Sequence, residues 1–164
     1  MATTATADSF TRAWVSVERT GKISNALKTT WQNSPLYPEL VAESTEKHLR
    51  SISARDLENL MAKYPGSAAI ANLRWKKLFR LGRANWHEDF LFLYRPTDSV
   101  ELNCYNLEAR FHLNQDTAAD HRKAVHLWTH GKSQPKACDT LFSMIQKRDL
   151  ITKEVRLRRI DNAL

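Results

Sequence analysis

The sequence predicts an all-α protein: an irregular α-solenoid, or superhelix, of about ten helices in stacked hairpins. Apolar residues recur at steps of three and four almost throughout the 164-residue chain, which is the period of an α-helix. Only 4 Gly and 5 Pro are present, too few for the many tight turns of an all-β chain. Hairpins are expected to begin near residues 8, 35, 67, 98 and 136, a repeat of roughly 30–38 residues that is typical of stacked α-hairpins. A compact helical bundle is the alternative architecture.

Four helices are expected in the first part of the chain. Their apolar positions and boundaries place them near residues 10–17, 23–31, 34–41 and 53–64. Ser34 is a candidate N-cap of the third helix and Ser53 of the fourth, because serine side chains accept hydrogen bonds from the first free backbone N–H groups. Pro65 and Gly66 end the fourth helix.

Six further helices are expected after residue 66. They fall near residues 67–81, 86–93, 100–113, 118–129, 137–145 and 150–160. Residues 1–8 lack a basic or strongly apolar stretch, so we expect a disordered tail rather than a signal peptide. Residues 9–164 then form one helical domain, and no apolar run is long enough to span a membrane.

The five tryptophans lie on the apolar faces of their expected helices, so we expect each of them to pack in the core. They are Trp14, Trp31, Trp75, Trp86 and Trp128. Stacking on sugars or on single-stranded nucleic acid is the alternative role of such rings.

Positive charge is unevenly distributed along the chain. Residues 1–70 carry 8 Lys and Arg against 7 Asp and Glu, whereas residues 71–164 carry 17 against 11. A basic second half favours an anionic partner such as nucleic acid, an acidic membrane surface or an anionic polymer. A solvated basic face without a partner is equally compatible with these counts.

The sequence offers no complete catalytic or metal site and predicts no cofactor. His121, His126 and His130 lie close together, but no carboxylate completes a metal-binding pattern, so we expect solvent-facing histidines and no metal. No nucleophile turn or phosphate-binding loop is present. Cys104 and Cys138 lie on neighbouring hairpins, where they could be two buried thiols or a disulfide.

The segment 127–142 resembles part of the superhelical, non-catalytic scaffold of soluble lytic murein transglycosylases, near its N-terminal end. The residues that carry this resemblance are Leu127, Trp128, Gly131, Lys132, Ser133, Gln134, Pro135, Ala137, Cys138, Asp139, Leu141 and Phe142. The stretch from Pro35 to Pro38 is similar to an early segment of the same family.

The resemblance implies a scaffold that assists binding of peptidoglycan glycan strands, in cell-wall turnover in the periplasm. It also favours a Cys104–Cys138 disulfide, because family members carry cysteines at both places. The family uses one Glu as acid and then base in a C-terminal lysozyme-like domain, and we expect that domain to be absent from this chain. Glu43 precedes Ser44 as in the family's catalytic motif, but the rest of the motif is missing, so we expect the chain to be inactive alone and to be a truncated copy or one piece of the enzyme.

Two further functions stay open. The chain could be a free-standing helical-repeat adaptor that binds a protein, or, less favoured, a basic nucleic-acid-binding domain. Expected partners are therefore peptidoglycan or an absent catalytic domain, and the sequence does not determine the oligomeric state.

Overall fold

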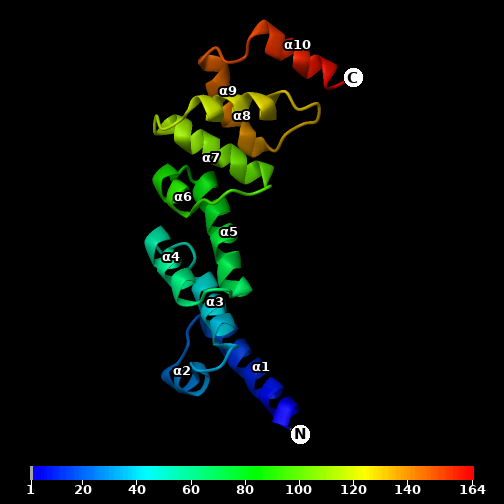
Figure 1. Ribbon diagram of the computed structural model, residues 1–164. Coiled ribbons are helices and arrows are strands. Elements are labelled where there is room, and N and C mark those ends of the chain that lie inside the picture. The colour runs from blue at the N-terminus through cyan, green and yellow to red at the C-terminus, as the bar shows by residue number, and fades with distance from the viewer. Residues whose placement is uncertain (1) are drawn as a thin grey trace. The chain divides into compact units, whose positions relative to one another are not determined.

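The computed structural model describes the backbone of residues 2–164 and the side chains from residue 7 onward. Over these residues it contains ten α-helices, one short 3₁₀ helix and no strand (Figure 1). The predicted all-α class and the expected number of helices are confirmed. The chain divides into two compact units, of which unit 1 ends at Lys77 and unit 2 comprises Leu78–Leu164.

Unit 1 is built from four helices and the beginning of a fifth. They are α1 (Ala2–Thr20), α2 (Asn25–Trp31), α3 (Tyr37–Lys47), α4 (Ala54–Lys63) and α5 (Ala68–Arg83). Helix α1 packs against α3 around a core cluster of Ala13, Val17, Trp31, Tyr37 and Leu40. The edge-to-face contact of Phe10 with Trp31, with ring centroids 5.3 Å apart, extends this cluster.

Unit 2 takes residues 78–83 of α5 and adds five α-helices. They are α6 (His87–Leu93), α7 (Val100–His112), α8 (Ala118–Trp128), α9 (Asp139–Lys147) and α10 (Lys153–Asp161), with the 3₁₀ helix η1 at Lys136–Cys138. Helix α7 is the centre of the unit, since it packs against α6, α8, η1 and α9. Six of its 13 residues are buried, which leaves little of its surface for solvent.

The N-terminal segment differs from the expected tail. Helix α1 begins at Ala2, so helix covers most of the 1–8 segment, where we expect a disordered tail from the sequence. Met1 lies outside the described residues. Alanine has the highest helix propensity and no Gly or Pro interrupts this segment, so nothing in it stops the helix that Phe10 and Trp14 anchor.

Side-chain caps fix several helix starts, although not every predicted one. Ser53 caps α4 as predicted, because the Asp56 N–H donates to its Oγ at 3.0 Å. Ser34 does not cap α3, which begins at Tyr37 after Leu36 without a side-chain cap. Ser34 Oγ accepts from the Leu36 N–H within the preceding turn instead. The two prolines near the start of α3 therefore set its beginning rather than a serine.

A buried ammonium group binds the turn between α3 and α4 in unit 1. Lys77 is 3% exposed, and its Nζ donates to the carbonyl oxygens of Leu49 at 3.0 Å, Arg50 at 3.3 Å and Ile52 at 2.8 Å. These carbonyls belong to the turn between α3 and α4, where no helix supplies them with backbone donors. The lysine thus satisfies acceptors that would otherwise be buried without partners.

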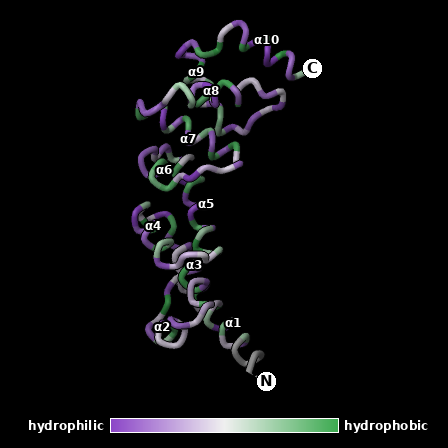
Figure 2. Tube along the Cα trace, in the orientation of Figure 1, coloured by the Kyte–Doolittle hydropathy of each residue, from purple (hydrophilic) through white to green (hydrophobic). Residues whose placement is uncertain are grey.

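Hydrophobic and hydrophilic residues are interleaved along the helices (Figure 2). Among the described residues, no helix combines the length and the apolar character needed to cross a bilayer.

Candidate functional site

The segment from Leu127 to Asp139 forms the connection between α8 and α9 and is attached to the centre of unit 2. Cys138, at the end of η1, forms a disulfide with Cys104 of α7, and their Cα atoms lie 5.0 Å apart. Both cysteines are fully buried in a core cluster with Leu107, Phe111, Ala124, Leu141, Ile145 and Ile151. The bridge therefore ties the end of this connection to α7.

The other residues of this segment make turn and packing contacts. Leu127 and Trp128 end α8 and pack against the core cluster, and the Arg159 guanidinium lies over the Trp128 ring at 4.4 Å from its centroid. Gly131 lies against the main chain of Asn162: a Cβ at residue 131 would be 1.8 Å from the Asn162 carbonyl oxygen. Asn162 Nδ2 in turn donates to the Thr129 carbonyl oxygen at 2.7 Å.

The polar residues of the segment do not converge on a common point. Lys132, Ser133 and Asp139 are exposed, and Gln134 Nε2 donates to the Lys132 carbonyl oxygen at 2.9 Å within the turn. Pro135 precedes η1, and Ala137 is half-buried beside Cys138. This segment therefore serves as a structural connection.

A groove of about 630 Å³ lies beside α8, which is within the usual size range of ligand sites. It is lined by residues 94–97, by α7 and by α8, through Tyr94, Pro96, Thr97, Asn103, Asn106, Leu107, Ala119, Arg122, Lys123, His126 and Leu127. Asn103 of α7 holds the segment 94–97 in place, on one wall of the groove. Its side chain accepts a hydrogen bond from the Tyr94 hydroxyl at 2.6 Å and donates one to the Thr97 carbonyl oxygen at 2.9 Å.

The opposite wall presents polar groups that remain available to a ligand. The side chains of Asn106, Arg122, Lys123 and His126 make no hydrogen bond or ion pair with any described residue. Arg122, Lys123 and His126 are exposed on α8, and Asn106 lies half-buried on α7. The groove therefore combines cations, one amide and an apolar floor, a set suited to a polar anionic ligand.

Helix α8 is held in place at its N-terminus by two carboxylates. Asp120 forms a capping box with Thr117 and accepts from Arg110 Nε at 3.0 Å. Burial opposes the charged form, but the hydrogen bonds from Thr117 and the nearby Arg110 lower the pKa of the Asp120 carboxyl. This ion pair orients the first turn of α8, and Arg122 and Lys123 follow in the next turn, beside the groove.

Asp116, just before α8, is the second carboxylate. Its Oδ2 lies 2.6 Å from His121 Nε2 and 2.9 Å from Arg148 Nη1, and the hydrogen bond to His121 is the largest cause that lowers the pKa of Asp116. Arg148 also donates to the Phe111 carbonyl oxygen at 3.0 Å. These contacts join the start of α8 to α7 and to the end of α9.

The histidine predictions were partly wrong. His126 and His130 are exposed as expected, but His121 pairs with Asp116 and packs against the Phe111 ring instead of facing solvent. His126 lies in the groove. The Asp116–His121 pairing at i, i+5 spans the start of α8, which is why a helical-face argument does not find it.

The tryptophan predictions were also partly wrong. Trp31 is buried and Trp14 and Trp128 are partly buried, as expected. Trp75 and Trp86 are 42% and 56% exposed. Trp86 precedes the first residue of α6 rather than lying on its apolar face, so helical periodicity does not determine its environment.

Motifs and helical periodicity do not identify Asn106, Arg122 or Lys123 as site residues. Charge counts give one usable signal: residues 122–164 carry 10 Lys and Arg against 4 Asp and Glu. Unit 1 carries 11 Lys and Arg against 7 Asp and Glu, and unit 2 carries 14 Lys and Arg against 11 Asp and Glu. Both units are therefore basic, and within unit 2 the cationic excess begins at α8.

The soluble lytic murein transglycosylase of Escherichia coli strain K12 is 30% identical to this chain over 111 residues, which are 67% of this chain and 17% of that protein. The same protein of Escherichia coli O157:H7 matches with the same identity and coverage. No family model matches the chain.

Solved structures give the same result over more of the chain. The lytic transglycosylase Slt of Pseudomonas aeruginosa, solved as an inactive mutant, matches with a TM-score of 0.78 and 26% identity over 94% of this chain. The 70-kDa soluble lytic transglycosylase in complex with bulgecin A has the same TM-score at 24% identity, which shows the fold alone. This chain spans about a quarter of the length of either structure and 17% of the curated relatives. The resemblance found from the sequence is thereby confirmed.

Proposed function

We propose, because curated and structural relatives both point to soluble lytic murein transglycosylases, that this chain is a non-catalytic scaffold segment of such an enzyme. In this role it assists binding of a peptidoglycan glycan strand during cell-wall turnover in the periplasm. The observation that carries the proposal is the groove beside α8, with Arg122, Lys123, His126 and Asn106 free to contact a ligand.

The chemistry of the groove fits such a strand. Sugar hydroxyl and amide groups exchange hydrogen bonds with an asparagine side chain, and carboxylates pair with arginine and lysine. The partly buried Tyr94 and Leu127 give the apolar surface on which a sugar ring can lie. The cations are exposed, so each contributes modestly and the affinity is expected to weaken with salt.

We propose further that this chain alone does not cleave peptidoglycan. Glu43, in the Glu-Ser dipeptide, lies on α3 and pairs with Lys47 at 3.4 Å, one turn along the same helix. Such a pair is an ordinary helix-surface contact. Purified chain should release no anhydro-muropeptides from sacculi, and Glu43→Gln should change nothing.

Sedimentation with purified sacculi tests the binding role. The intact chain should co-sediment, and Arg122→Ala combined with Lys123→Ala should weaken that binding several-fold. Lys153→Ala combined with Arg156→Ala is the matched control, because it removes two exposed positive charges from α10 of the same unit. The control variant should bind nearly as well as the intact chain.

Three results would contradict the proposal. The intact chain could fail to co-sediment, or the two double variants could lose binding equally, which would mean that overall charge rather than the groove is responsible. Tighter binding to single-stranded nucleic acid, with the steep salt dependence of phosphate contacts, would favour the nucleic-acid alternative.

A further inference from the structure

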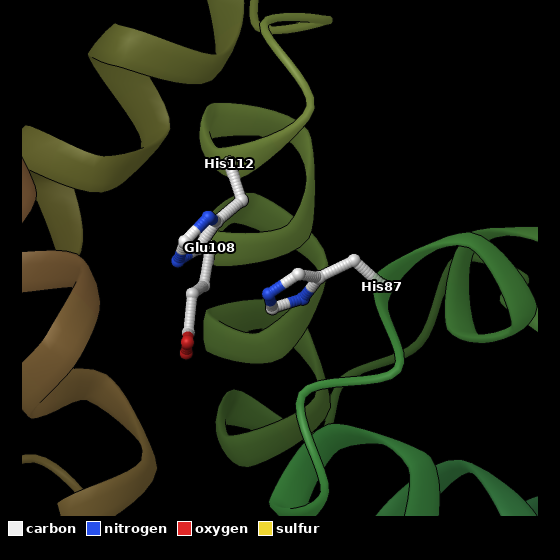
Figure 3. A group of neighbouring side chains, drawn as sticks. All are labelled: His87, Glu108 and His112. Atoms are coloured by element: carbon white, nitrogen blue, oxygen red, sulfur yellow. The ribbon is translucent and has the colours of Figure 1, made fainter.

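Three potential metal ligands meet at the contact between α6 and α7. His87 is the first residue of α6, and Glu108 and His112 lie one turn apart on α7. One ligand atom from each of the three lies within 4.8 Å of the others (Figure 3). The cluster lies wholly within unit 2 and involves none of the groove residues.

Local structure places the three side chains together. Asn85 adopts a left-handed conformation after α5, and His87 follows at the start of α6. Its ring stacks on the His112 ring, with centroids 4.5 Å apart and an interplanar angle of 22°. Residues four apart on a helix share a face, so Glu108 lies beneath the same pair of rings. Figure 3 shows the Glu108 carboxylate extending along α7 below His112, with His87 approaching from α6.

Glu108 carries the strongest indication of a missing ligand. It is only 4% exposed, yet its carboxylate makes no hydrogen bond or ion pair with any described residue. Burial accordingly raises the pKa of the Glu108 carboxyl. A largely buried carboxylate without a protein partner is costly to keep charged, and a bound cation would stabilise the charged form.

The histidines are suited to the same cation. Each imidazole offers one ring nitrogen to the cluster, and imidazole nitrogen is a common zinc ligand. His112 is exposed, so its ring can turn toward an ion without disturbing the core. Zinc ligands at about 2.0–2.1 Å in a tetrahedron lie roughly 3.3 Å from one another, so the side chains must close by about 1.5 Å at most.

We propose that His87, Glu108 and His112 bind one divalent transition-metal ion, with zinc as the preferred metal. Two imidazoles and one carboxylate form a ligand set that zinc takes readily, with a fourth position left for water. Magnesium and calcium prefer oxygen ligands and would bind poorly here. The ion would join the start of α6 to α7 and neutralise the Glu108 carboxylate.

Zinc titration of the chelator-treated, disulfide-bonded chain tests the proposal. Isothermal titration calorimetry at pH 7.5 should show one zinc ion per chain, and zinc should raise the melting temperature because it binds the folded state. Cobalt(II) should give the visible absorption bands of a low-coordinate site, and magnesium should give no signal. Absence of zinc binding to the intact chain would overturn the proposal.

Variants distinguish this site from others on the chain. Glu108→Gln should reduce zinc affinity at least tenfold, because zinc-binding sites depend on every charged ligand. The same substitution should raise the melting temperature of the metal-free chain, because it removes a buried carboxylate that lacks a partner, so loss of binding cannot be ascribed to misfolding. His112→Ala should likewise reduce zinc affinity at least tenfold.

The matched control is His130→Ala. His126 and His130 are four residues apart and exposed, so they form the rival site that surface histidines could provide. Unchanged zinc binding in His130→Ala supports the cluster on α6 and α7. Loss of binding in His130→Ala, with retention in Glu108→Gln, would assign the zinc to the surface histidines and overturn the proposal.

Discussion

Unit 1 and unit 2 end their helices with different residues. In unit 1 the left-handed positions are glycines: Gly21, with φ of 68°, follows α1, and Gly66, with φ of 83°, follows α4. In unit 2 the left-handed positions among the described residues are Asn85, Asn114 and Asp149, with φ of 57°, 54° and 55°. Asparagine and aspartate tolerate this region better than other residues that carry a side chain.

The three endings in unit 2 share one hydrogen-bond pattern. After α5, the Trp86 N–H donates to the Leu81 carbonyl and the Asn85 N–H donates to the Gly82 carbonyl. The same pair of bonds closes α7 around Asn114 and α9 around Asp149. These are Schellman motifs, in which glycine is the usual residue at the left-handed position.

Glycine has another role in unit 2. A Cβ at Gly82 would lie 2.4 Å from the Tyr105 ring, and a Cβ at Gly131 would lie 1.8 Å from the Asn162 carbonyl oxygen. At Gly66 no atom lies within 4 Å of such a Cβ. Thus glycine provides backbone conformation in unit 1 and space in unit 2, and its presence alone does not identify a helix end.

The units also differ in how they hold their connections. In unit 1 the Lys77 ammonium binds three carbonyls of the turn before α4, whereas in unit 2 a disulfide holds the connection before α9. The contact in unit 1 depends on a buried charge and that in unit 2 on a covalent bond. Removing the Lys77 ammonium should therefore weaken unit 1, and reducing the disulfide should weaken unit 2.

Removing the disulfide should have the largest effect. We expect Cys104→Ser, or reduction of the intact chain, to lower the free energy of unfolding of unit 2 by roughly 3–4 kcal/mol, because the bridge closes a loop of 34 residues. Hydrogen exchange should show faster exchange in α7 and α9 and little change in α3. The reductant should have no further effect on Cys104→Ser, and thiol titration of the oxidised intact chain under denaturant should find no free thiol.

Removing the buried ammonium should be the corresponding change in unit 1. Lys77→Met keeps the length of the side chain but leaves buried carbonyls without a donor, so we expect a loss of about 2–3 kcal/mol. Exchange should become faster around residues 48–52, while α7 stays protected. Lys28→Met, at an exposed site of unit 1, is the control and should be nearly neutral. Equal effects of the two variants would contradict the role given to Lys77.

Filling the space at Gly82 should weaken unit 2 by about 2 kcal/mol, since Gly82→Ala forces the Tyr105 ring to move. Chemical denaturation would measure the loss. Combining Gly82→Ala with Tyr105→Ala should recover part of it relative to Tyr105→Ala alone. An additive double variant would show that the ring is not what excludes a Cβ.

Changing the left-handed glycine of unit 1 should cost less. Gly66→Ala should destabilise by about 1 kcal/mol although there is space for the methyl group, because φ of 83° is strained for alanine. Gly66→Asn should cost less than Gly66→Ala. In unit 2, Asn114→Gly should be neutral or slightly stabilising, in contrast to Gly82→Ala. Thermal denaturation at several denaturant concentrations would rank these four variants.

The smallest expected effect is the acid sensitivity supplied by Asp116. The lowered pKa of this carboxyl stabilises the fold above its unfolded pKa, and that stability is lost as the pH falls through the lowered folded pKa. Its partners are about one third exposed, so we expect less than about 1 kcal/mol. Asp116→Asn should reduce stability at pH 6 and make it less dependent on pH below about 4. An unchanged pH profile would contradict this role.

The sequence predicts the helices because helical periodicity is a local property, and it predicts Ser53 as a cap for the same reason. The sequence does not predict helix ends at left-handed residues other than glycine, such as Asn114 at the end of α7. It also does not predict sites that form through tertiary contacts. His87 reaches Glu108 and His112 only because α6 packs on α7. Only the spacing of Glu108 and His112 on one helix could have been noticed from the sequence.

The disulfide has a consequence for limited proteolysis. The exposed turn that contains Lys132 and Ser133 lies between the two cysteines in the sequence. A protease that cuts after Lys132 would leave one fragment with Cys104 and another with Cys138. The nicked molecule would migrate as one species until a reductant separates it into two bands, so a single cut in this turn would stay hidden on a non-reducing gel.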